Sequence, residues 1–590
     1  KSYGKKGDAV VQMNWKAIDA GVDAVHKVNV PESWHNPAPD AAPKALKGPD
    51  ALVKQIRDVM EPISRMDGDS LPVSAFEGNV NGEWEQGASA YEKRGTAVMV
   101  PEWDAEKCIQ CNQCAFVCSH ATIRPFCLTA DEAANAPEST KLADTKPKAG
   151  EYKFTMAVSP LDCMGCGECV TVCPTKAIEM KPQESQAAQQ AAFDYCVENI
   201  RKKDNIPGVV SDISVKGSQF NQPLLEFSGS CAGCAETSYA RLITQLFGEK
   251  MFISNATGCS SIWGGTASIS PYTTNKESGF GPAWINSLFE DNAEHGLGMQ
   301  IGYETVRANL ITKVEALKGK NADLDAVIDK YLETKNNTKA NDAPAKALIA
   351  ALEACGCDES KEILKDKQYL AKKSFWIFGG DGWAYDIGYG GLDHVLASGH
   401  DVNVMVFDTE MYSNTGGQAS KASNIGEVCQ FAAAGKEISK KSLAEICMTY
   451  GYIYVAQIAL GANMAQAVKA IAEAEAYPGP SIIIGYAPCE LHGVKGGMTN
   501  CQNEMKKAVE AGYWNLFTFN PALKAEGKNP FTLTSKAGKM DKYQEFLANE
   551  TRYSRLSRAF PDRAKALFEK NQEAAEARYT HLTKLVDLYK

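Results

Sequence analysis

The sequence contains no apolar run of the roughly 18 residues that a membrane-spanning helix needs. It also lacks an excess of basic residues, because the formal net charge is −10, and this disfavours binding to nucleic-acid phosphates. No secretory signal precedes its nineteen cysteines. Most of these cysteines stand in or near metal-ligand spacings, so metal sites are favoured over a disulfide framework. We therefore expect a cytoplasmic protein that binds neither membrane nor nucleic acid.

The length of 590 residues exceeds what one hydrophobic core usually organises, so we expect several domains. In the first segment, residues 9–14 suit a buried strand and residues 15–28 an amphipathic helix. The chain starts at Lys1 without an initiator Met, which suggests one piece of a longer polypeptide. Composition and periodicity predict five segments: the end of a preceding α/β domain (1–34), a connector (35–101), a ferredoxin-like two-cluster domain (102–200), a cofactor-binding α/β domain (201–530), and a helical C-terminal extension that is a candidate subunit interface (531–590).

The long central segment alternates between strand-like and helix-like patterns. Near-continuous apolar runs are typical of strands that are covered on both faces, and such strands form doubly wound parallel sheets. Residues 305–373 carry no strand signal and are expected to form a helical excursion from this domain. The apolar runs that predict the sheet are residues 375–378, 402–407, 452–458 and 481–486.

Two copies of the run C-x2-C-x2-C-x3-C indicate an internal duplication. In this pattern three thiolates bind one [4Fe-4S] cluster and the fourth reaches the other cluster. Paired structural zinc sites are the alternative, since C-x2-C is also a zinc spacing. Cys127 and Cys196 match neither pattern and are expected to be free core thiols. The spacing predicts one cluster on Cys108, Cys111, Cys114 and Cys173, and a second cluster on Cys163, Cys166, Cys169 and Cys118.

Four further cysteines are scattered along the α/β segment: Cys231, Cys234, Cys259 and Cys489. The last follows a predicted buried strand, at the carboxyl edge where open α/β sheets bind ligands. A third [4Fe-4S] cluster would explain them, and buried structural cysteines are the alternative. The remaining cysteines are interpreted as buried and structural: Cys355, Cys357, Cys429, Cys447 and Cys501.

Two polar turns follow consecutive predicted strands. Gly380 and Gly382 flank Asp381 in the first turn and allow close backbone approach to a diphosphate. The second turn offers the Thr409 hydroxyl and the Met411 carbonyl, and such oxygens bind Mg2+. The sequence thus predicts a thiamine diphosphate and Mg2+ site on Asp381, Thr409 and Met411, although Gly-Asp-Gly alone is a common turn.

Long motifs carry a resemblance to the carboxy-terminal half of pyruvate:ferredoxin oxidoreductases, within the 2-oxoacid:ferredoxin oxidoreductase family. The resemblance covers nearly the whole chain and keeps the order of the family motifs. The motifs are Glu92 to Gly95, Cys231-Ala-Gly-Cys-Ala-Glu236, Gly380-Asp-Gly-Trp-Ala-Tyr-Asp386, Asp408 to Gln418 and Ala487-Pro-Cys-Glu-Leu-His-Gly493.

This resemblance implies roles for individual residues. Cys231, Cys234, Cys259 and Cys489 would hold a proximal cluster beside the thiamine. Asn414 would be a catalytic amide near the reacting carbon, and Asn14 is a candidate contact for coenzyme A. The implied cofactor contacts are Glu236, Cys259, Gly380, Asp381, Gly382, Trp383, Thr409, Glu410, Met411, Tyr412, Ser413 and Asn414.

The resemblance further implies oxidative decarboxylation of pyruvate with coenzyme A to acetyl-CoA and CO2, in anaerobic metabolism. Electrons would pass from a thiamine radical intermediate through three [4Fe-4S] clusters to ferredoxin or flavodoxin. A homodimer is expected. Most substrate-binding residues would lie in the amino-terminal half of the same polypeptide, so we expect these 590 residues alone to bind clusters without turning over pyruvate.

Three alternatives remain open at this stage. The substrate could be another 2-oxo acid, such as 2-oxoglutarate or an aryl pyruvate. The acceptor could be NADP. The chain could instead be a polyferredoxin electron carrier, which would bind no thiamine diphosphate.

Overall fold

The structure is a computed structural model that describes residues 3–4, 7–35, 45–148, 152–266, 269–319 and 322–590. Parts of the first two predicted segments, residues 1–2, 5–6 and 36–44, lie outside this description. The chain divides into two compact units, Lys1–Val53 and Lys54–Lys590, which we describe separately.

The first unit contains helix α1 (Asp8–Asp23) and the 3-10 turn η2 (Glu32–Trp34). The strand predicted for residues 9–14 is therefore wrong, because these residues begin α1. Apolar residues recur at helical spacing from within the predicted strand into the predicted helix, at Val11, Trp15, Ile18 and Val22. No described residue of α1 is buried, and Val22 is 72% exposed.

The described residues of the predicted connector contain several short helices and helical turns. Helix α2 (Asp50–Gln55) leads into the π-helical turn η3 (Ile56–Met60) and helix α3 (Glu61–Ser64). Short 3-10 turns follow as η4 (Gly68–Ser70), η5 (Val73–Asn79) and η6 (Ala88–Tyr91).

The cysteine-rich segment forms two small antiparallel sheets. One pairs β1 (Met99–Trp103) with β5 (Ile178–Pro182), and the other has the order β2-β4-β3. A small core that includes Trp103, Phe154 and Phe220 packs beside the cysteines. The remaining elements are β2 (Ile123–Leu128), β3 (Ala143–Asp144), β4 (Lys153–Val158), α4 (Gln113–Val117), α5 (Ala130–Ala134), α6 (Glu168–Thr171), η7 (Gln183–Gln186), α7 (Gln189–Asn199) and α8 (Val215–Ser218).

An eight-stranded sheet organises the α/β segment, in the order β15-β14-β12-β13-β9-β8-β6-β7. The strands from β12 to β7 pair in parallel, whereas β14 and β15 are antiparallel. All four predicted apolar runs contribute strands to this sheet. The strands are β6 (Met251–Asn255), β7 (Ala283–Asn286), β8 (Ser374–Gly380), β9 (Asn403–Asp408), β12 (Tyr454–Ile458), β13 (Ser481–Tyr486), β14 (Phe517–Phe519) and β15 (Phe531–Leu533).

Helices cover both faces of the sheet. Trp376 stacks on Phe247 at the end of α9, whereas a side chain at Gly296 of α11 would strike Ile377. Because neighbouring strand residues point to opposite faces, α9 and α11 lie on opposite sides of β8. The predicted doubly wound sheet is therefore confirmed. The helices of this part are α9 (Ala235–Phe247), α10 (Cys259–Gly264), α11 (Asn292–Glu315), α15 (Tyr389–Ala397), α16 (Leu443–Met448), α17 (Met464–Ala476) and α18 (Cys501–Ala511).

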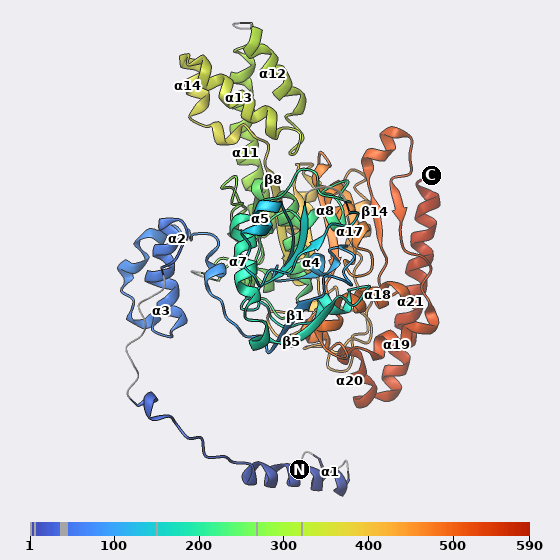
Figure 1. The fold of residues 1–590 in the computed structure, drawn as a ribbon. Helices are drawn as coiled ribbons and strands as arrows, with labels where there is room; N and C mark the ends of the chain where they lie inside the picture. The colour runs from blue at the N-terminus through green and yellow to red at the C-terminus, as the bar shows by residue number, and fades with distance from the viewer. Residues whose placement is uncertain (1–2, 5–6, 36–44, 149–151, 267–268, 320–321) are drawn as a thin grey trace. The chain divides into compact units, whose positions relative to one another are not determined.

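The described residues of 305–373 are mainly helical, as predicted, and form a lobe with its own hydrophobic core. Figure 1 shows its helices bundled at the outer end of α11. Leu310, Tyr331, Leu348 and Ile363 are among the residues buried in this core. The lobe comprises α12 (Ala322–Thr334), α13 (Asp342–Cys355), α14 (Asp358–Leu364) and the turn η9 (Lys367–Tyr369).

The C-terminal extension packs on its own α/β domain. Its first residues form β15 rather than helix. Leu567 and Leu582 are buried, whereas Leu588 is 74% exposed. The extension contains η14 (Met540–Lys542), α19 (Tyr543–Ala548), α20 (Thr551–Ala559) and α21 (Pro561–Leu588).

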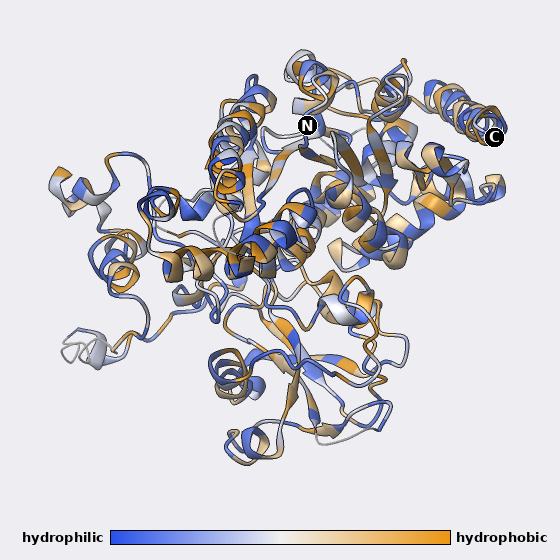
Figure 2. Cartoon of the chain, turned by 90° about the horizontal axis from the view of Figure 1, so that it is seen from above, coloured by the Kyte–Doolittle hydropathy of each residue, from blue (hydrophilic) through white to orange (hydrophobic). Residues whose placement is uncertain are grey.

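The helices in Figure 2 carry hydrophilic and hydrophobic residues side by side. Within the described ranges, no helix has the length and apolarity that a membrane crossing requires.

Candidate functional site

The structure gathers the first predicted cysteine group around one small pocket. This pocket is also lined by Trp103, Met156 and Ile178. Burial, and then the neighbouring thiols, raise the pKa of Cys114 well above its usual range. The four cysteines that line the pocket are Cys108, Cys111, Cys114 and Cys173.

The second predicted group is also brought together. Burial raises the pKa of Cys169, and the thiols that add to this effect are those of Cys166, Cys163, Cys118 and Cys114. Since Cys114 belongs to the first group, the two groups are neighbours. The fourth cysteine of each run therefore lies in the group of the other run.

The backbone repeats the duplication seen in the sequence. The Gln110 amide donates to Cys108 Sγ over 3.3 Å, and the equivalent Gly165 amide donates to Cys163 Sγ over 3.4 Å. Such N–H donors stabilise negative charge on cluster thiolates. Three residue pairs at equivalent positions share a left-handed φ: Gln110 and Gly165 (58° and 69°), Asn112 and Gly167 (60° and 81°), and Ala121 and Lys176 (55° and 53°).

These thiols fit iron–sulfur clusters on chemical grounds. Burial and the repulsion that neighbouring thiolates would exert on one another favour the neutral thiol form. Cluster iron would displace the thiol protons. Within the described part of the chain, no three side chains of His, Cys, Asp or Glu are placed to hold a single metal ion. Cys127 is buried in the same small core as Cys114, and Cys196 is buried in a second core cluster, as the sequence predicts.

A third group forms where two helices of the α/β domain begin and one strand ends. Burial, followed by Glu236 and the three other thiols, raises the pKa of Cys259. Cys234 precedes α9, Cys259 begins α10, and Cys489 follows β13. The structure thus brings together all four scattered cysteines: Cys231, Cys234, Cys259 and Cys489.

His120 joins the second and third groups. It lies two residues after Cys118, and its Nε2 is 3.1 Å from the carbonyl oxygen of Ser230, which precedes Cys231. The other ring nitrogen contacts the Ser119 hydroxyl at 2.9 Å. A short covalent and hydrogen-bonded path therefore connects the two thiol groups.

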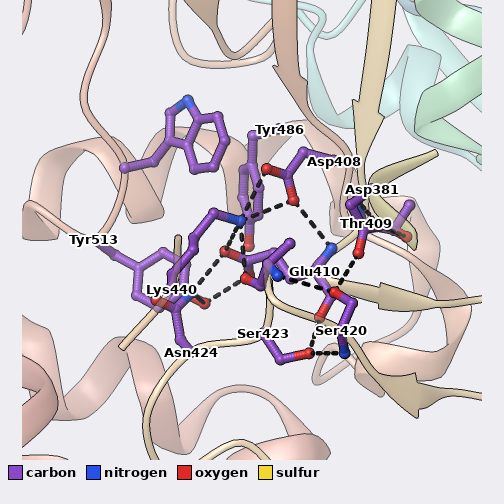
Figure 3. Close-up of polar contacts among 12 residues, drawn as sticks. Asp381, Asp408, Thr409, Glu410, Ser420, Ser423, Asn424, Lys440, Tyr486 and Tyr513 are labelled. Carbon is purple, nitrogen blue, oxygen red and sulfur yellow. Dashed lines mark hydrogen bonds and ion pairs between the residues drawn. The ribbon is translucent and has the colours of Figure 1, made fainter. Parts of the chain in front are cut away.

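The two predicted polar turns meet at the carboxyl ends of β8 and β9 (Figure 3). The Thr409 hydroxyl lies 2.9 Å from Asp381 Oδ1 and 3.0 Å from the Met411 carbonyl oxygen. Octahedral Mg2+ with ligands at about 2.1 Å separates adjacent oxygens by about 3 Å. The Thr409 hydroxyl therefore lies at separations from the other two predicted oxygens that fit neighbouring ligands of one Mg2+ ion.

Close packing explains the glycines of the first turn only in part. A side chain at Gly382 would strike the ring of Tyr412, and one at Gly379 would strike Trp383. A side chain at Gly380 would meet only a carbonyl oxygen at 3.9 Å, so that position is open. Gly380 therefore leaves the approach to its backbone clear, as a diphosphate requires.

A half-buried lysine supports the second turn. Lys440 Nζ lies 2.8 Å from Asp408 Oδ1, 3.3 Å from Glu410 Oε1 and 3.0 Å from the Ala422 carbonyl oxygen (Figure 3). Burial alone would lower the pKa of Lys440, but the two carboxylates raise it. Lys440 therefore neutralises charge directly beneath the predicted Mg2+ ligands.

Glu410 is held in a left-handed conformation, with φ 62°. Its carboxylate accepts from Tyr513 at 2.6 Å and pairs with Arg552 at 2.8 Å. Burial would raise the pKa of Glu410, but Lys440 and Arg552 lower it to about 2. The side chain of Glu410, a predicted cofactor contact, is thus held in an ion network. Its left-handed backbone allows the Thr409 hydroxyl to approach the Met411 carbonyl oxygen.

One loop connects the third thiol group to this turn. The loop after β13 carries Cys489 and, three residues later, His492. His492 Nε2 lies 2.8 Å from the Thr409 carbonyl oxygen. Burial, followed by Arg552, lowers the pKa of His492 to about 3, so the ring is neutral and donates through Nε2.

The other predicted contacts differ in burial. Trp383 and Glu236 are buried, and Trp263 Nε1 donates to Glu236 over 3.0 Å. Ser413 donates to the Thr409 hydroxyl over 2.7 Å, and Asn414 is exposed. Three side chains that support the turn were not predicted from the sequence: Lys440, Arg552 and His492. Of these, only His492 lies inside a family motif, residues 487–493.

Comparison with known protein families matches three parts of the chain. Residues 107–177 match a 4Fe-4S dicluster domain, and residues 364–484 match the thiamine pyrophosphate enzyme C-terminal TPP-binding domain. Residues 40–97, which largely coincide with the predicted connector, match a domain of unknown function.

The chain is 48% identical over 593 residues to pyruvate-flavodoxin oxidoreductase of Klebsiella pneumoniae, covering 99% of this chain and 50% of that protein. It is 48% identical over 601 residues to pyruvate:ferredoxin oxidoreductase of Moorella thermoacetica, covering 100% and 50%. The chain is a homologue of these oxidoreductases. It spans about half the length of the curated relatives that it matches. Another relative, mitochondrial pyruvate dehydrogenase [NADP(+)] of Euglena gracilis, is 44% identical over 599 residues, which cover 99% of this chain and 32% of that protein.

Proposed function

We propose that this chain supplies the cofactor-binding and electron-transfer part of an enzyme that oxidises pyruvate with coenzyme A to acetyl-CoA and CO2. Ferredoxin or flavodoxin is the proposed electron acceptor. The observation that carries the proposal is the loop after β13. It places Cys489 in a four-thiol group and His492 against the turn of three oxygens, so a cluster and a thiamine site would share one support.

The oxygens of Asp381, Thr409 and Met411 would hold Mg2+, and the open backbone at Gly380 would receive the diphosphate. Bound thiamine diphosphate supplies the carbon nucleophile that attacks a 2-keto group and permits loss of CO2. The exposed Asn414 would orient the reacting group. Glu236 would contact the cofactor beside Cys259.

The three thiol groups would each hold one [4Fe-4S] cluster. Electrons would leave through the group of Cys259, pass His120 to the group of Cys118, and reach the pocket of Cys114. We assign two clusters to residues 102–200, and the third cluster together with thiamine diphosphate to residues 201–530. The substrate contacts are assigned to the remaining half of a longer polypeptide, which we propose forms a cytoplasmic homodimer.

The proposal is tested with anaerobically purified protein. For this chain we expect about twelve iron and twelve sulfide, and tight binding of Mg2+ with thiamine diphosphate. For the longer polypeptide that includes the substrate half we expect ferredoxin reduction that requires both pyruvate and coenzyme A, whereas these 590 residues alone should not reduce ferredoxin. The variant Thr409→Val should lose cofactor binding and keep its iron, whereas Thr409→Ser retains the hydroxyl and should bind. Full iron without cofactor binding by the parent chain would instead indicate a polyferredoxin carrier.

Substrate choice is tested in the same assay. Pyruvate should support reduction far better than 2-oxoglutarate or an aryl pyruvate. A reversed preference would keep the cofactor assignment and refute the proposed substrate.

A further inference from the structure

Cys355 and Cys357 differ from the other cysteines outside the thiol groups. Both were expected to be buried, and that expectation is wrong for Cys355, which is exposed, while Cys357 is half-buried. Cys429, Cys447 and Cys501 are all buried, as expected. The exposed pair lies in the helical lobe of α11 to α14, which has its own core.

A tight reversal between two helices brings these thiols together. Cys355 ends α13, Gly356 has φ 61°, and Cys357 is the residue that precedes α14. The Gly356 amide closes α13 by donating to the Leu352 carbonyl oxygen over 3.2 Å. The two Sγ atoms consequently lie 3.0 Å apart.

Ser360 completes a small polar cluster on the first turn of α14. Its hydroxyl lies 3.0 Å from Cys357 Sγ. Hydrogen bonds from Ser360 and from Cys357 lower the pKa of Cys355. An exposed thiol whose pKa is lowered and which has a second thiol in contact is the arrangement found in reactive dithiols.

We propose that Cys355 and Cys357 form a redox-active dithiol that closes to an intramolecular disulfide by exchange with low-molecular-weight disulfides. The Cys355 thiolate attacks one sulfur of the small disulfide and expels the other sulfur as a thiolate. Cys357 then loses its proton and attacks Cys355 Sγ, which expels the second small thiol. Two protein thiols are oxidised by two electrons, and one small disulfide is reduced to two thiols.

The pair is separate from the sites described above. The one-residue gap matches no ligand run of the iron–sulfur groups. Gly356 has open space where a side chain would be, so its role is the left-handed turn and not close packing. Oxidation should therefore leave the clusters in place.

The sequence offers a clean measurement, because trypsin would release residues 347–361 with only these two cysteines. The holoprotein is equilibrated anaerobically in buffers of reduced and oxidised glutathione, quenched in acid, alkylated after denaturation, and digested. We expect one transition to a peptide about 2 Da lighter that resists alkylation. Residues 442–469, with buried Cys447 as their only cysteine, are the internal control and should stay fully alkylated.

Variants separate the two steps. Cys357→Ser should stop at a glutathione adduct on Cys355, whereas Cys355→Ser should form no disulfide. Ser360→Ala should slow alkylation of Cys355 severalfold near neutral pH, because a hydrogen bond to the thiolate is lost. The proposal is overturned if peptide 347–361 keeps two free thiols in every buffer, or if it oxidises no more readily than the Cys447 control.

Discussion

In residues 108–173 the candidate ligands of two clusters come from two short loops, whereas the candidate ligands of the α/β domain come from segments far apart in the sequence. The conformation of the two loops is set by local sequence, since left-handed residues and N–H···S bonds recur at equivalent positions. The α/β site depends on the sheet, on Lys440, and on the ion network around Arg552. The two regions should therefore respond differently to the same kind of change.

The largest effect is expected where the α/β site depends on the buried ion network. Arg552 pairs with Glu410 at 2.8 Å, Glu427 at 3.2 Å and Glu550 at 2.6 Å. Arg552→Met would leave buried Glu427 and Glu550 without this cation, and Glu410 with Lys440 alone, at a cost of about 3–5 kcal/mol in the free energy of unfolding. Chemical denaturation measures this loss.

The matched control for Arg552 is an exposed ion pair. Lys469 lies 3.5 Å from Glu473 and is 74% exposed. Lys469→Met should change stability by less than about 0.5 kcal/mol. Equal effects of the two variants would refute a special role for the ion network.

The next effect tests the independence of the cysteine loops. Cys114→Ser should remove one cluster, so iron should fall from about twelve to about eight per chain while thiamine diphosphate binding persists. Cys127→Ser alters a buried thiol of the same core and should leave iron unchanged. Loss of iron in both variants would indicate general unfolding instead of ligand loss.

The third effect concerns the magnesium turn, where a change should affect cofactor binding and leave the clusters in place. Asp381→Asn removes the only carboxylate among the three proposed Mg2+ ligands and should weaken cofactor binding by at least about 100-fold, with iron content unchanged. Isothermal titration with Mg2+ and thiamine diphosphate measures the change. Loss of iron together with binding would show that the two regions are not independent.

The smallest effect concerns the loop that joins the two sites. His492→Leu removes the donor to the Thr409 carbonyl oxygen, a bond of 2.8 Å, and should weaken cofactor binding about fivefold, or about 1 kcal/mol. His492→Gln keeps an amide donor and should bind more tightly than His492→Leu. Identical affinities for the two variants would contradict a role for this bond.

The same contrast explains what the sequence could predict. The cysteine runs have fixed local spacing, and each of the four apolar runs that predict the sheet overlaps one of its strands. The third thiol group and the magnesium turn were found through motifs placed at strand ends. Lys440 and Arg552 could not be found, because their partners are set by long-range packing and neither stands in a recognisable spacing.

Two errors have local causes. A strand was predicted for residues 9–14 because they contain adjacent valines. The helical spacing of apolar residues extends into this segment, and the structure forms helix α1 there. Cys355 was expected to be buried because free cysteines usually are, and the left-handed turn at Gly356 that exposes it has no unique sequence signal.

Iron content tests the account most directly, when it is measured together with cofactor binding on the same anaerobic preparation. The account predicts about twelve iron per chain, and about eight in the variant Cys231→Ser/Cys234→Ser, with Mg2+ and thiamine diphosphate bound in both. About eight iron in the unaltered chain, unchanged by this double substitution, would contradict a third cluster beside the thiamine site.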